Sequence, residues 1–298
     1  MLFAHRLVPV DSPAPMRSLE LTTTLLVLTS AAIHALWNAL LKKTRAPEDA
    51  VVGAMVVSAL AAVGIALFAW PPWPNTTSLG WTLASGVLEA VYFSTLARAL
   101  TRAPLGPVYT IIRGGALVVV WPVSIVFLHE RVSLATIGGT TLVVLGLAAT
   151  GLGDRGAGKE MRLGWAIVCA FFVGAYQVAY KLGLATGGTP TAINAISLAS
   201  AASANLVVGG AARALRGWSA TRAEPLKVLT AGVFASAGFV VFLIAMKDAG
   251  AGVAVTLRNT SILFAQGIAW AMGEKPTRLG LVGAALVTGG AVLLSVPR

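Results

Sequence analysis

Ten apolar stretches, separated by short polar breaks, follow one another along this sequence of 298 residues. A helix needs about 20 apolar residues to cross the hydrocarbon core of a bilayer, so this repetition constrains the fold more than any other feature. The sequence lacks the alternation of polar and apolar residues that is typical of membrane β-strands. We therefore expect an all-α membrane protein with ten transmembrane helices. The stretches cover about 21–41, 50–70, 79–100, 104–128, 133–151, 163–184, 190–212, 227–246, 250–272 and 279–296, with a polar loop expected over 213–225.

The composition agrees with a chain that lies in a bilayer. Hydrophobic residues make up 57% and charged residues 11% of the chain, and the mean hydropathy is +0.82. In a soluble domain about a quarter of the residues are charged. Ten crossings leave no room for a separate catalytic domain, so we do not expect an enzyme. We assign the net charge of +11 to short loops beside anionic lipid headgroups, and expect no nucleic acid partner.

Cofactor and metal sites are not expected. The single cysteine, Cys169, lies in an apolar run and excludes both an intramolecular disulfide and a Cys-based metal site. The segment GDRGAGKE has neither the spacing nor the preceding strand of a phosphate-binding loop. His34 is the one histidine inside a predicted helix, and a single histidine without further ligands does not build a zinc site.

The chain divides into two halves of five predicted helices each. A Gly-rich charged linker separates them, and a proline-containing leader, expected to be disordered, precedes the first. Within that leader, Met16 is an alternative start to Met1. The expected domains are the leader over 1–18, a first repeat over 19–151, the linker over 152–162 and a second repeat over 163–298.

The ends of the two halves match each other most clearly. The interval from Glu130 to Gly139 equals the interval from Glu274 to Gly283, and a Gly-rich helix follows each glutamate. A copy with an odd number of crossings enters the membrane upside down relative to its predecessor. We therefore expect two inverted five-helix repeats with a binding site between them near the bilayer midplane. The alternative is chance similarity between apolar helices.

These paired blocks resemble a known family. Each contains a short turn, His129-Glu130-Arg131 or Gly273-Glu274-Lys275, and a Gly-rich last helix, as in the two EamA-type repeats of the drug/metabolite transporter superfamily. The resemblance covers about residues 19–296 and implies ten helices, alternating access and movement of small metabolites, outward in many members. It does not imply one substrate. Further residues that carry it are Trp37, Asn38, Lys42, Glu89, Tyr92, Phe93, Tyr109, Arg113 and Gly114.

Two ionisable residues lie inside predicted spans of the first half. Glu89 is the one carboxylate well within a span, and a charge at the bilayer centre costs about 2.5–3.5 kcal/mol, so it is a functional candidate. We expect Glu89 to exchange a proton or contact the substrate, unless it merely bonds a neighbouring helix in its protonated form. Arg113 is expected to hold Glu89 or an anionic group of the substrate, the alternative being a side chain that reaches the interface.

Aromatic and carboxamide residues recur at matching places in both halves. Trp37 precedes Asn38 in the first predicted helix, and Tyr176 precedes Gln177 in the sixth, with Tyr180 one turn further on. Polar stripes on spanning helices face protein or water rather than lipid. We expect these five residues to line the substrate site, the aromatic rings against apolar parts and the carboxamides as hydrogen-bond partners.

Four more residues, Tyr92, Tyr109, Asn259 and His34, complete the candidate site. Tyr92 follows Glu89 by one turn, and Asn259 lies in the ninth predicted helix beside Arg258, with the alignment leaving open which of that pair faces inward. His34, one turn before Asn38, is a second candidate for proton transfer, with a hydrogen-bonded packing role as the alternative. The predicted substrate-binding residues are Trp37, Asn38, Glu89, Tyr92, Tyr109, Arg113, Tyr176, Gln177, Tyr180 and Asn259, and the predicted proton-coupling residues are Glu89 and His34.

We therefore predict a secondary active transporter that moves a small metabolite, such as an amino-acid-like compound, by alternating access in a bacterial inner membrane. A flippase for a lipid-linked metabolite and an intramembrane enzyme are the alternatives. The loops carry six Lys and Arg on the side of the termini and fourteen on the other. The positive-inside rule then places the termini outside, whereas the family resemblance places them in the cytoplasm, so the orientation stays open.

Overall fold

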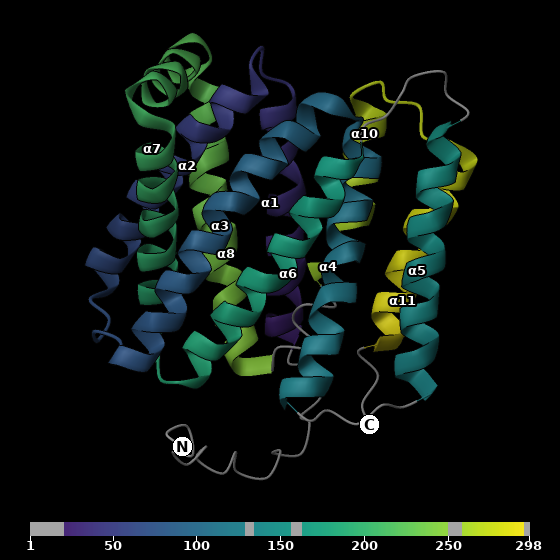
Figure 1. The fold of residues 1–298 in the computed structure, drawn as a ribbon, viewed down its shortest axis with the longest axis horizontal. Coiled ribbons are helices and arrows are strands. Elements are labelled where there is room, and N and C mark those ends of the chain that lie inside the picture. The colour runs from purple at the N-terminus through teal and green to yellow at the C-terminus, as the bar shows by residue number, and fades with distance from the viewer. Residues whose placement is uncertain (1–20, 129–133, 156–162, 250–257, 295–298) are drawn as a thin grey trace.

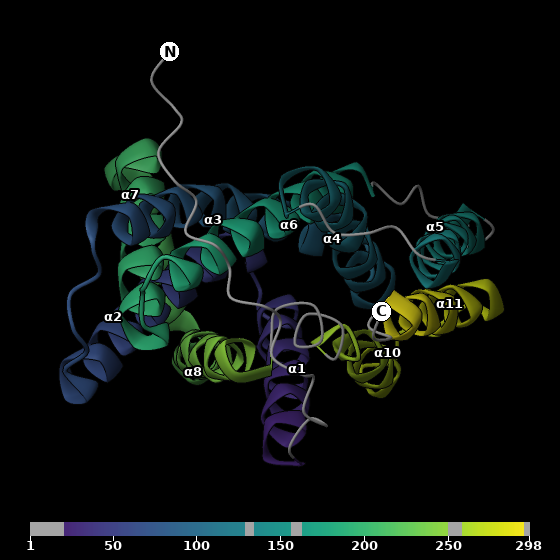
Figure 2. The ribbon, with the colours of Figure 1, turned by 90° about the horizontal axis from the view of Figure 1, so that it is seen from below.

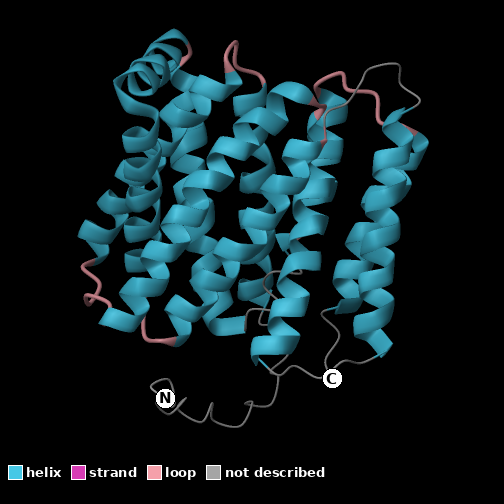
Figure 3. Ribbon diagram, in the orientation of Figure 1, coloured by secondary structure: helices cyan, strands magenta, loops and turns pink. Residues whose placement is uncertain are grey.

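The computed structural model describes residues 21–128, 134–155, 163–249 and 258–294, which form an all-α bundle (Figure 1, Figure 3). These residues contain ten helices and no strand. The first half provides α1 (Leu21–Lys42), α2 (Pro47–Ala69), α3 (Thr76–Arg102), α4 (Leu105–Leu128) and α5 (Leu134–Arg155). The second half provides α6 (Gly164–Ala185), α7 (Pro190–Ala223), α8 (Pro225–Ala249), α10 (Ser261–Ala271) and α11 (Arg278–Leu294).

Proline and polar residues set several helix starts. Pro47 opens α2, and Glu48 and Asp49 follow in its first turn, where carboxylates interact favourably with the helix dipole. The Asn75 side chain accepts a hydrogen bond of 2.9 Å from the backbone N–H of Ser78 and so caps α3. These signals explain why eight of the ten predicted stretches coincide with helices to within a few residues. The ninth, predicted over 250–272, differs because α10 begins at Ser261, and its residues 250–257 lie outside the described residues.

The predicted loop over 213–225 is wrong, because α7 continues to Ala223. The helix bends at Gly210, whose φ of 63° and ψ of −173° belong to a region that only glycine occupies without strain. After the bend the sequence is rich in alanine and arginine, which are good helix formers even where hydropathy falls. Of the other predicted features, the leader, Glu130 and most of the linker lie outside the described residues.

Six of the described helices are long and apolar enough to cross a membrane, namely α1, α2, α3, α6, α7 and α8. Shorter apolar segments occur in α4, α5, α10 and α11, over Leu105–Val120, Ile137–Thr150, Ser261–Ala271 and Arg278–Leu293. A helix of about 20 residues spans the hydrocarbon core, so this bundle is an integral, multi-pass membrane protein.

The helices run side by side in alternating directions (Figure 1). Seen from below, α2 and α7 pack together at one edge, and α5 and α11 pack together at the other (Figure 2). Between these edges, α3 and α4 pack on α6, while α8 and α10 pack on α1. The interior is therefore built from both halves of the chain.

One end of the bundle gathers basic side chains, and we call it the basic end. It holds the turn between α1 and α2, with Lys43 and Arg45, and the turn between α7 and α8, with Glu224 and Lys227 (Figure 1). The Glu224 carboxylate bonds the Lys227 ammonium and accepts a bond of 2.7 Å from the Arg45 backbone N–H. These two bonds lower the pKa of Glu224 below its usual value and join the two turns.

Candidate functional site

All the residues predicted to contact substrate or to carry a proton are buried inside the bundle. The predicted ionisable residues are among the most enclosed, with Glu89 0% and Arg113 2% exposed. Arg113 therefore does not reach out to an interface. The same burial holds for His34, Trp37, Asn38, Tyr92, Tyr109, Tyr176, Gln177, Tyr180 and Asn259. Whether these residues bind a substrate remains a prediction, but their placement agrees with an internal site.

Glu89 projects from the middle of α3 toward the second half of the chain. Its Oε2 atom accepts hydrogen bonds from the Tyr180 hydroxyl on α6, at 2.9 Å, and from the Ser197 hydroxyl on α7, at 2.8 Å. The Ser85 hydroxyl lies 2.8 Å from the Ser197 hydroxyl and extends this chain of polar groups. The other carboxylate oxygen, Oε1, is buried and has no hydrogen-bond partner among the described residues.

His34 lies between a tryptophan and an arginine. Its Nδ1 atom is 3.2 Å from Trp37 Nε1 and 3.3 Å from Nη2 of Arg258. Indole N–H and guanidinium groups only donate hydrogen bonds, so Nδ1 is the acceptor and the ring is neutral with its proton on Nε2. Asn38 on the next turn donates to the His34 carbonyl oxygen at 2.8 Å.

Two arginines lie in this interior, and neither forms an ion pair with a carboxylate among the described residues. Arg258 is 1% exposed, and its guanidinium carbon lies 3.9 Å from the ring centre of Phe242 and 4.5 Å from that of Phe239. The guanidinium carbon of Arg113 lies 5.7 Å from the ring centre of Tyr109. The expectation that Arg113 holds Glu89 is therefore not met, because hydroxyl groups bond that carboxylate instead.

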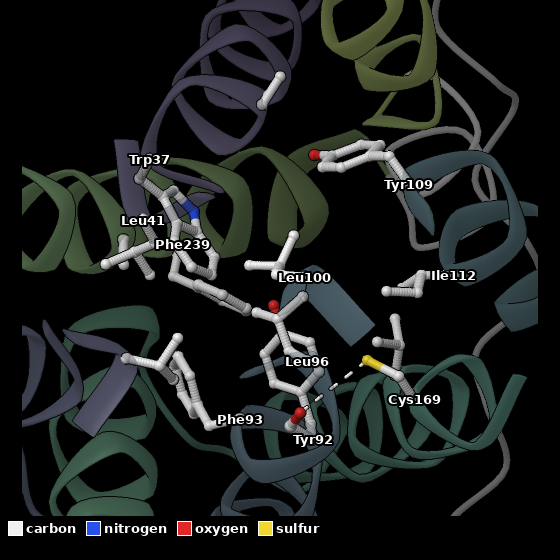
Figure 4. Packing of buried hydrophobic residues seen from close by; sticks show 14 of the residues in the cluster. Trp37, Leu41, Tyr92, Phe93, Leu96, Leu100, Tyr109, Ile112, Cys169 and Phe239 are labelled. Carbon is white, nitrogen blue, oxygen red and sulfur yellow. Dashed lines mark hydrogen bonds between the residues drawn. The ribbon is translucent and has the colours of Figure 1, made fainter. Parts of the chain in front are cut away.

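Aromatic rings surround these polar groups. The Tyr176 ring lies 5.3 Å from Tyr92, 5.7 Å from Tyr180 and 6.0 Å from Phe239, measured between ring centres. Figure 4 shows part of this wall, with Trp37 beside Phe239 and Tyr109 standing apart from them. We call His34, Glu89, Arg113, Tyr176 and Arg258 the central cluster. An interior of this kind offers charged and hydrogen-bonding groups within flat apolar surfaces.

At the basic end, one contact within the first half and one contact between the halves hold the turn between α3 and α4. The Lys42 ammonium donates to the carbonyl oxygens of Leu100, at 2.7 Å, and Ala103, at 2.6 Å, at the end of α3. Glu274, between α10 and α11, accepts from the backbone N–H of Leu105 at 2.9 Å, at the start of α4.

Comparison with known proteins identifies the second half of the chain. The model of the EamA-like transporter family matches residues 161–296. This half of the chain is therefore similar to the EamA-like transporter family, which is part of the drug/metabolite transporter superfamily.

Solved structures support the fold of this EamA-like chain. One described as "Crystal structure of protein" is 18% identical, with a TM-score of 0.61, and the match covers 92% of this chain and 96% of that one. At this identity the match concerns the fold alone. Comparison with curated proteins gives no match.

Sequence reasoning about this EamA-like chain missed two groups of residues in the site. The sequence does not decide between Arg258 and Asn259, although Arg258 carries the same signal as Arg113, a charge inside a predicted span. Ser197 and Phe239 carry no such signal, because a serine or phenylalanine in a spanning helix is common. Within the described residues, no group of three His, Cys, Asp or Glu is placed to hold a metal ion.

Proposed function

We propose that this EamA-like protein is a secondary active transporter that binds a small amphipathic metabolite at the central cluster. The two five-helix halves form inverted repeats that expose the cluster alternately to the two sides of a bacterial inner membrane. The metabolite carries a carboxylate or similar polar group, as amino-acid-like compounds do, and is exported. Glu89 takes up and releases the coupling proton.

The observation that supports this proposal best is the burial of unpaired polar atoms at the centre of the bundle. Among the described residues, Glu89 Oε1, the Tyr176 hydroxyl and several guanidinium nitrogens have no hydrogen-bond partner. Such a group costs about 1–3 kcal/mol of stability, and more if it is charged. A purely structural core gains nothing from these atoms, whereas a transporter needs them when a substrate enters.

The packing of helices supports an inverted repeat. A twofold pseudosymmetry would relate each helix to the one five places later in the chain, with α10 counted as the ninth helix and α11 as the tenth. It would turn the contact α3–α6 into α1–α8, the contact α4–α6 into α1–α10, and the contact α2–α8 into α3–α7. Every one of these pairs is in contact, as a twofold pseudosymmetry requires.

The register of the two repeats supports the same arrangement. Helices α5 and α11 approach each other closely at two pairs of glycines. A Cβ atom placed on Gly146 would lie 2.6 Å from the carbonyl oxygen of Gly283, and one placed on Gly290 would lie 2.6 Å from the carbonyl oxygen of Gly139. The offset that aligns Gly139 with Gly283 in the sequence also aligns Gly146 with Gly290. The two contacts therefore exchange under the symmetry that the sequence predicts.

Replacing Glu89 tests the coupling. A comparison of metabolite uptake and efflux in cells with and without the protein first identifies a transported compound. We then expect Glu89→Gln to abolish transport driven by a pH gradient in proteoliposomes, because glutamine keeps the shape but exchanges no proton. The variant should fold, since the amide can still accept from Tyr180 and Ser197.

Glu48→Gln is the matched control, because Glu48 lies at the basic end and forms only exposed contacts, an ion pair with Arg102 at 3.5 Å and a hydrogen bond from the Thr101 hydroxyl at 3.1 Å. It should transport with unchanged dependence on pH. An unchanged proton dependence in folded Glu89→Gln protein would remove Glu89 from the mechanism, and no flux of any metabolite would reject the transporter. Stimulation by one specific lipid would favour a flippase instead.

A further inference from the structure

The central cluster has more hydrogen-bond donors than acceptors. The groups without a partner among the described residues include Nη2 of Arg113, Nε and Nη1 of Arg258, Nδ2 of Asn259 and the Tyr176 hydroxyl. All of these can donate. Against them stand two unpaired oxygens that can only accept, Oε1 of Glu89 in the cluster and Oδ1 of Asn194 outside it. A ligand that completes this site must therefore bring lone pairs rather than N–H groups.

The two arginines are linked by a short run of contacts. Nη2 of Arg258 lies 3.3 Å from Nδ1 of His34, the His34 and Tyr109 ring centres lie 5.9 Å apart, and the Arg113 guanidinium carbon lies 5.7 Å from the Tyr109 ring centre. Phe239 joins Tyr176 to the same group, because its ring centre lies 6.0 Å from that of Tyr176 and 4.5 Å from the Arg258 guanidinium carbon. Two guanidinium groups that repel each other in an apolar interior are held there at a cost, and an anion placed between them removes both the repulsion and the unmet hydrogen bonds.

The charges in the cluster define the charge of that ligand. Arg113 and Arg258 contribute two positive charges, His34 is neutral because its Nδ1 accepts two bonds, and ionised Glu89 contributes one negative charge. One positive charge is left over. A monoanion neutralises it, whereas a zwitterion or a neutral compound leaves it buried and unpaired.

The surroundings define the rest of the ligand. Phe239 and Phe242 cover the faces of the Arg258 guanidinium and leave the donor nitrogens at its edge available. Tyr92, Tyr109 and Tyr176 add flat walls. Arginine forms a planar fork that matches a carboxylate or a similar oxyanion, and aromatic rings suit an apolar or flat body.

We propose that the central cluster binds a small organic monoanion whose oxyanion group is shared by Arg113 and Arg258 and whose apolar body lies among the aromatic rings. This inference rests on the proposed transport function for its location, and it names the class of substrate. An amino-acid-like substrate would accordingly be bound with its amino group blocked or absent, so that its net charge is −1.

Four compounds with one skeleton test the charge. N-acetylphenylalanine is the anion, N-acetylphenylalaninamide is neutral, phenylalanine is the zwitterion and phenylalaninamide is the cation. We expect calorimetry with the full chain in nanodiscs to give a Kd for the anion at least about tenfold below that for its neutral amide. The proposal is overturned if the anion binds no more tightly than the neutral amide.

Variants separate a binding role from a structural one. Arg258→Met and Arg113→Met should each weaken binding of the anion about tenfold or more and should not lower the apparent melting temperature, because each removes a buried charge without a carboxylate partner. Arg216→Met is the matched control, since Arg216 is exposed and pairs with Asp49 at 3.3 Å, and it should bind the anion as the unchanged protein does. A fall in melting temperature with unchanged anion binding in both core variants would overturn the proposal.

Flux measurements distinguish this inference from the proposed function. If proteoliposomes bind N-acetylphenylalanine but move neither it nor any metabolite, the transport function fails and the anion site stands. If the protein moves zwitterions or cations and shows no preference for the anion in binding, the anion site fails and the transport function stands.

Discussion

Gly86, one turn before Glu89 on α3, packs directly against α7 of the second half. A Cβ atom at this position would lie 2.6 Å from the Ser200 Cβ and 2.7 Å from the Ser197 carbonyl oxygen on α7. Gly86→Ala must therefore push α7 away from α3 and stretch the bond from Ser197 to Glu89. We expect it to destabilise the protein by about 1–3 kcal/mol, measured as a lower apparent melting temperature in detergent.

Gly80, two turns earlier on the same helix, is the matched control. A Cβ atom there would meet nothing within 4 Å, so Gly80→Ala should leave stability unchanged or raise it slightly. Equal melting temperatures for the two variants would mean that contact between α3 and α7 at Gly86 contributes little. That result would also weaken the role of Ser197 as a partner of Glu89.

At the residue scale, the sequence indicates which side chains are unusual but not which ones they touch. Glu89 and Arg113 stand out because a charge in an apolar span is costly, and both are buried as expected. The sequence suggests that they pair, but the carboxylate instead bonds Tyr180 and Ser197. Partners across helices depend on the rotation of each helix about its axis, which hydropathy alone does not determine.

At the scale of elements, the turn between α3 and α4 is held from both sides by the other helices. Lys42 bonds the last carbonyl oxygens of α3, and Glu274 bonds the first N–H groups of α4. Glu274→Gln keeps one acceptor but loses the charge that favours a helix N-terminus, which is worth about 1 kcal/mol. We expect it to open the basic end more often.

Thiol labelling measures that opening. Leu105→Cys, at a position that is 0% exposed, should react several times faster with a thiol reagent when combined with Glu274→Gln, in a Cys169→Ala background. Asp49→Asn is the control at the same end, because the ion pair of Asp49 is with Arg216 on α7 and involves neither α3 nor α4. Equal labelling rates in the two variants would show that Glu274 does not hold this end closed.

Helix bounds could be predicted because each break contains proline, glycine or charge, as at Pro47 and Thr189-Pro190. The continuation of α7 to Ala223 could not be predicted, because its residues after Gly210 are too polar for a transmembrane span but are good helix formers. Gly210 bends the helix between its apolar part and its polar part. A helix that carries Arg213, Arg216 and Trp218 beyond such a bend is suited to the membrane interface.

At the scale of the whole molecule, the proposed symmetry predicts that the contacts of Lys42 and Glu274 at the basic end have equivalents at the opposite end of the bundle. Lys42 and Glu274 have counterparts in the other repeat, Lys181 and Glu130. In an inverted repeat these counterparts lie at the opposite end and would close it when the basic end opens. The sequence predicts this arrangement from matched intervals, and the exchange of packing pairs between helices agrees with it.

The distribution of charge over the two ends predicts the orientation in the membrane. The basic end carries Lys43, Arg45 and Lys227 in its turns and Arg216, whose side chain is 59% exposed. Omitting Lys42, which bonds backbone carbonyl oxygens, and Arg98, which lies 4.7 Å over the Trp165 ring, still leaves most of the fourteen basic residues on this side. The positive-inside rule then places the basic end in the cytoplasm and both termini outside.

Single cysteines at the two ends test this orientation. The native Cys169 is 0% exposed and should not react with a membrane-impermeant thiol reagent. We expect Pro72→Cys, in the turn between α2 and α3, to be labelled in intact cells, and Lys43→Cys to be labelled only after the cells are permeabilised. The reverse pattern would place the basic end outside, as the family resemblance implies. In that case the distribution of Lys and Arg over the loops would not determine the orientation of this chain in the membrane. The end that holds the termini would be cytoplasmic, and an exported metabolite would enter the protein from that end.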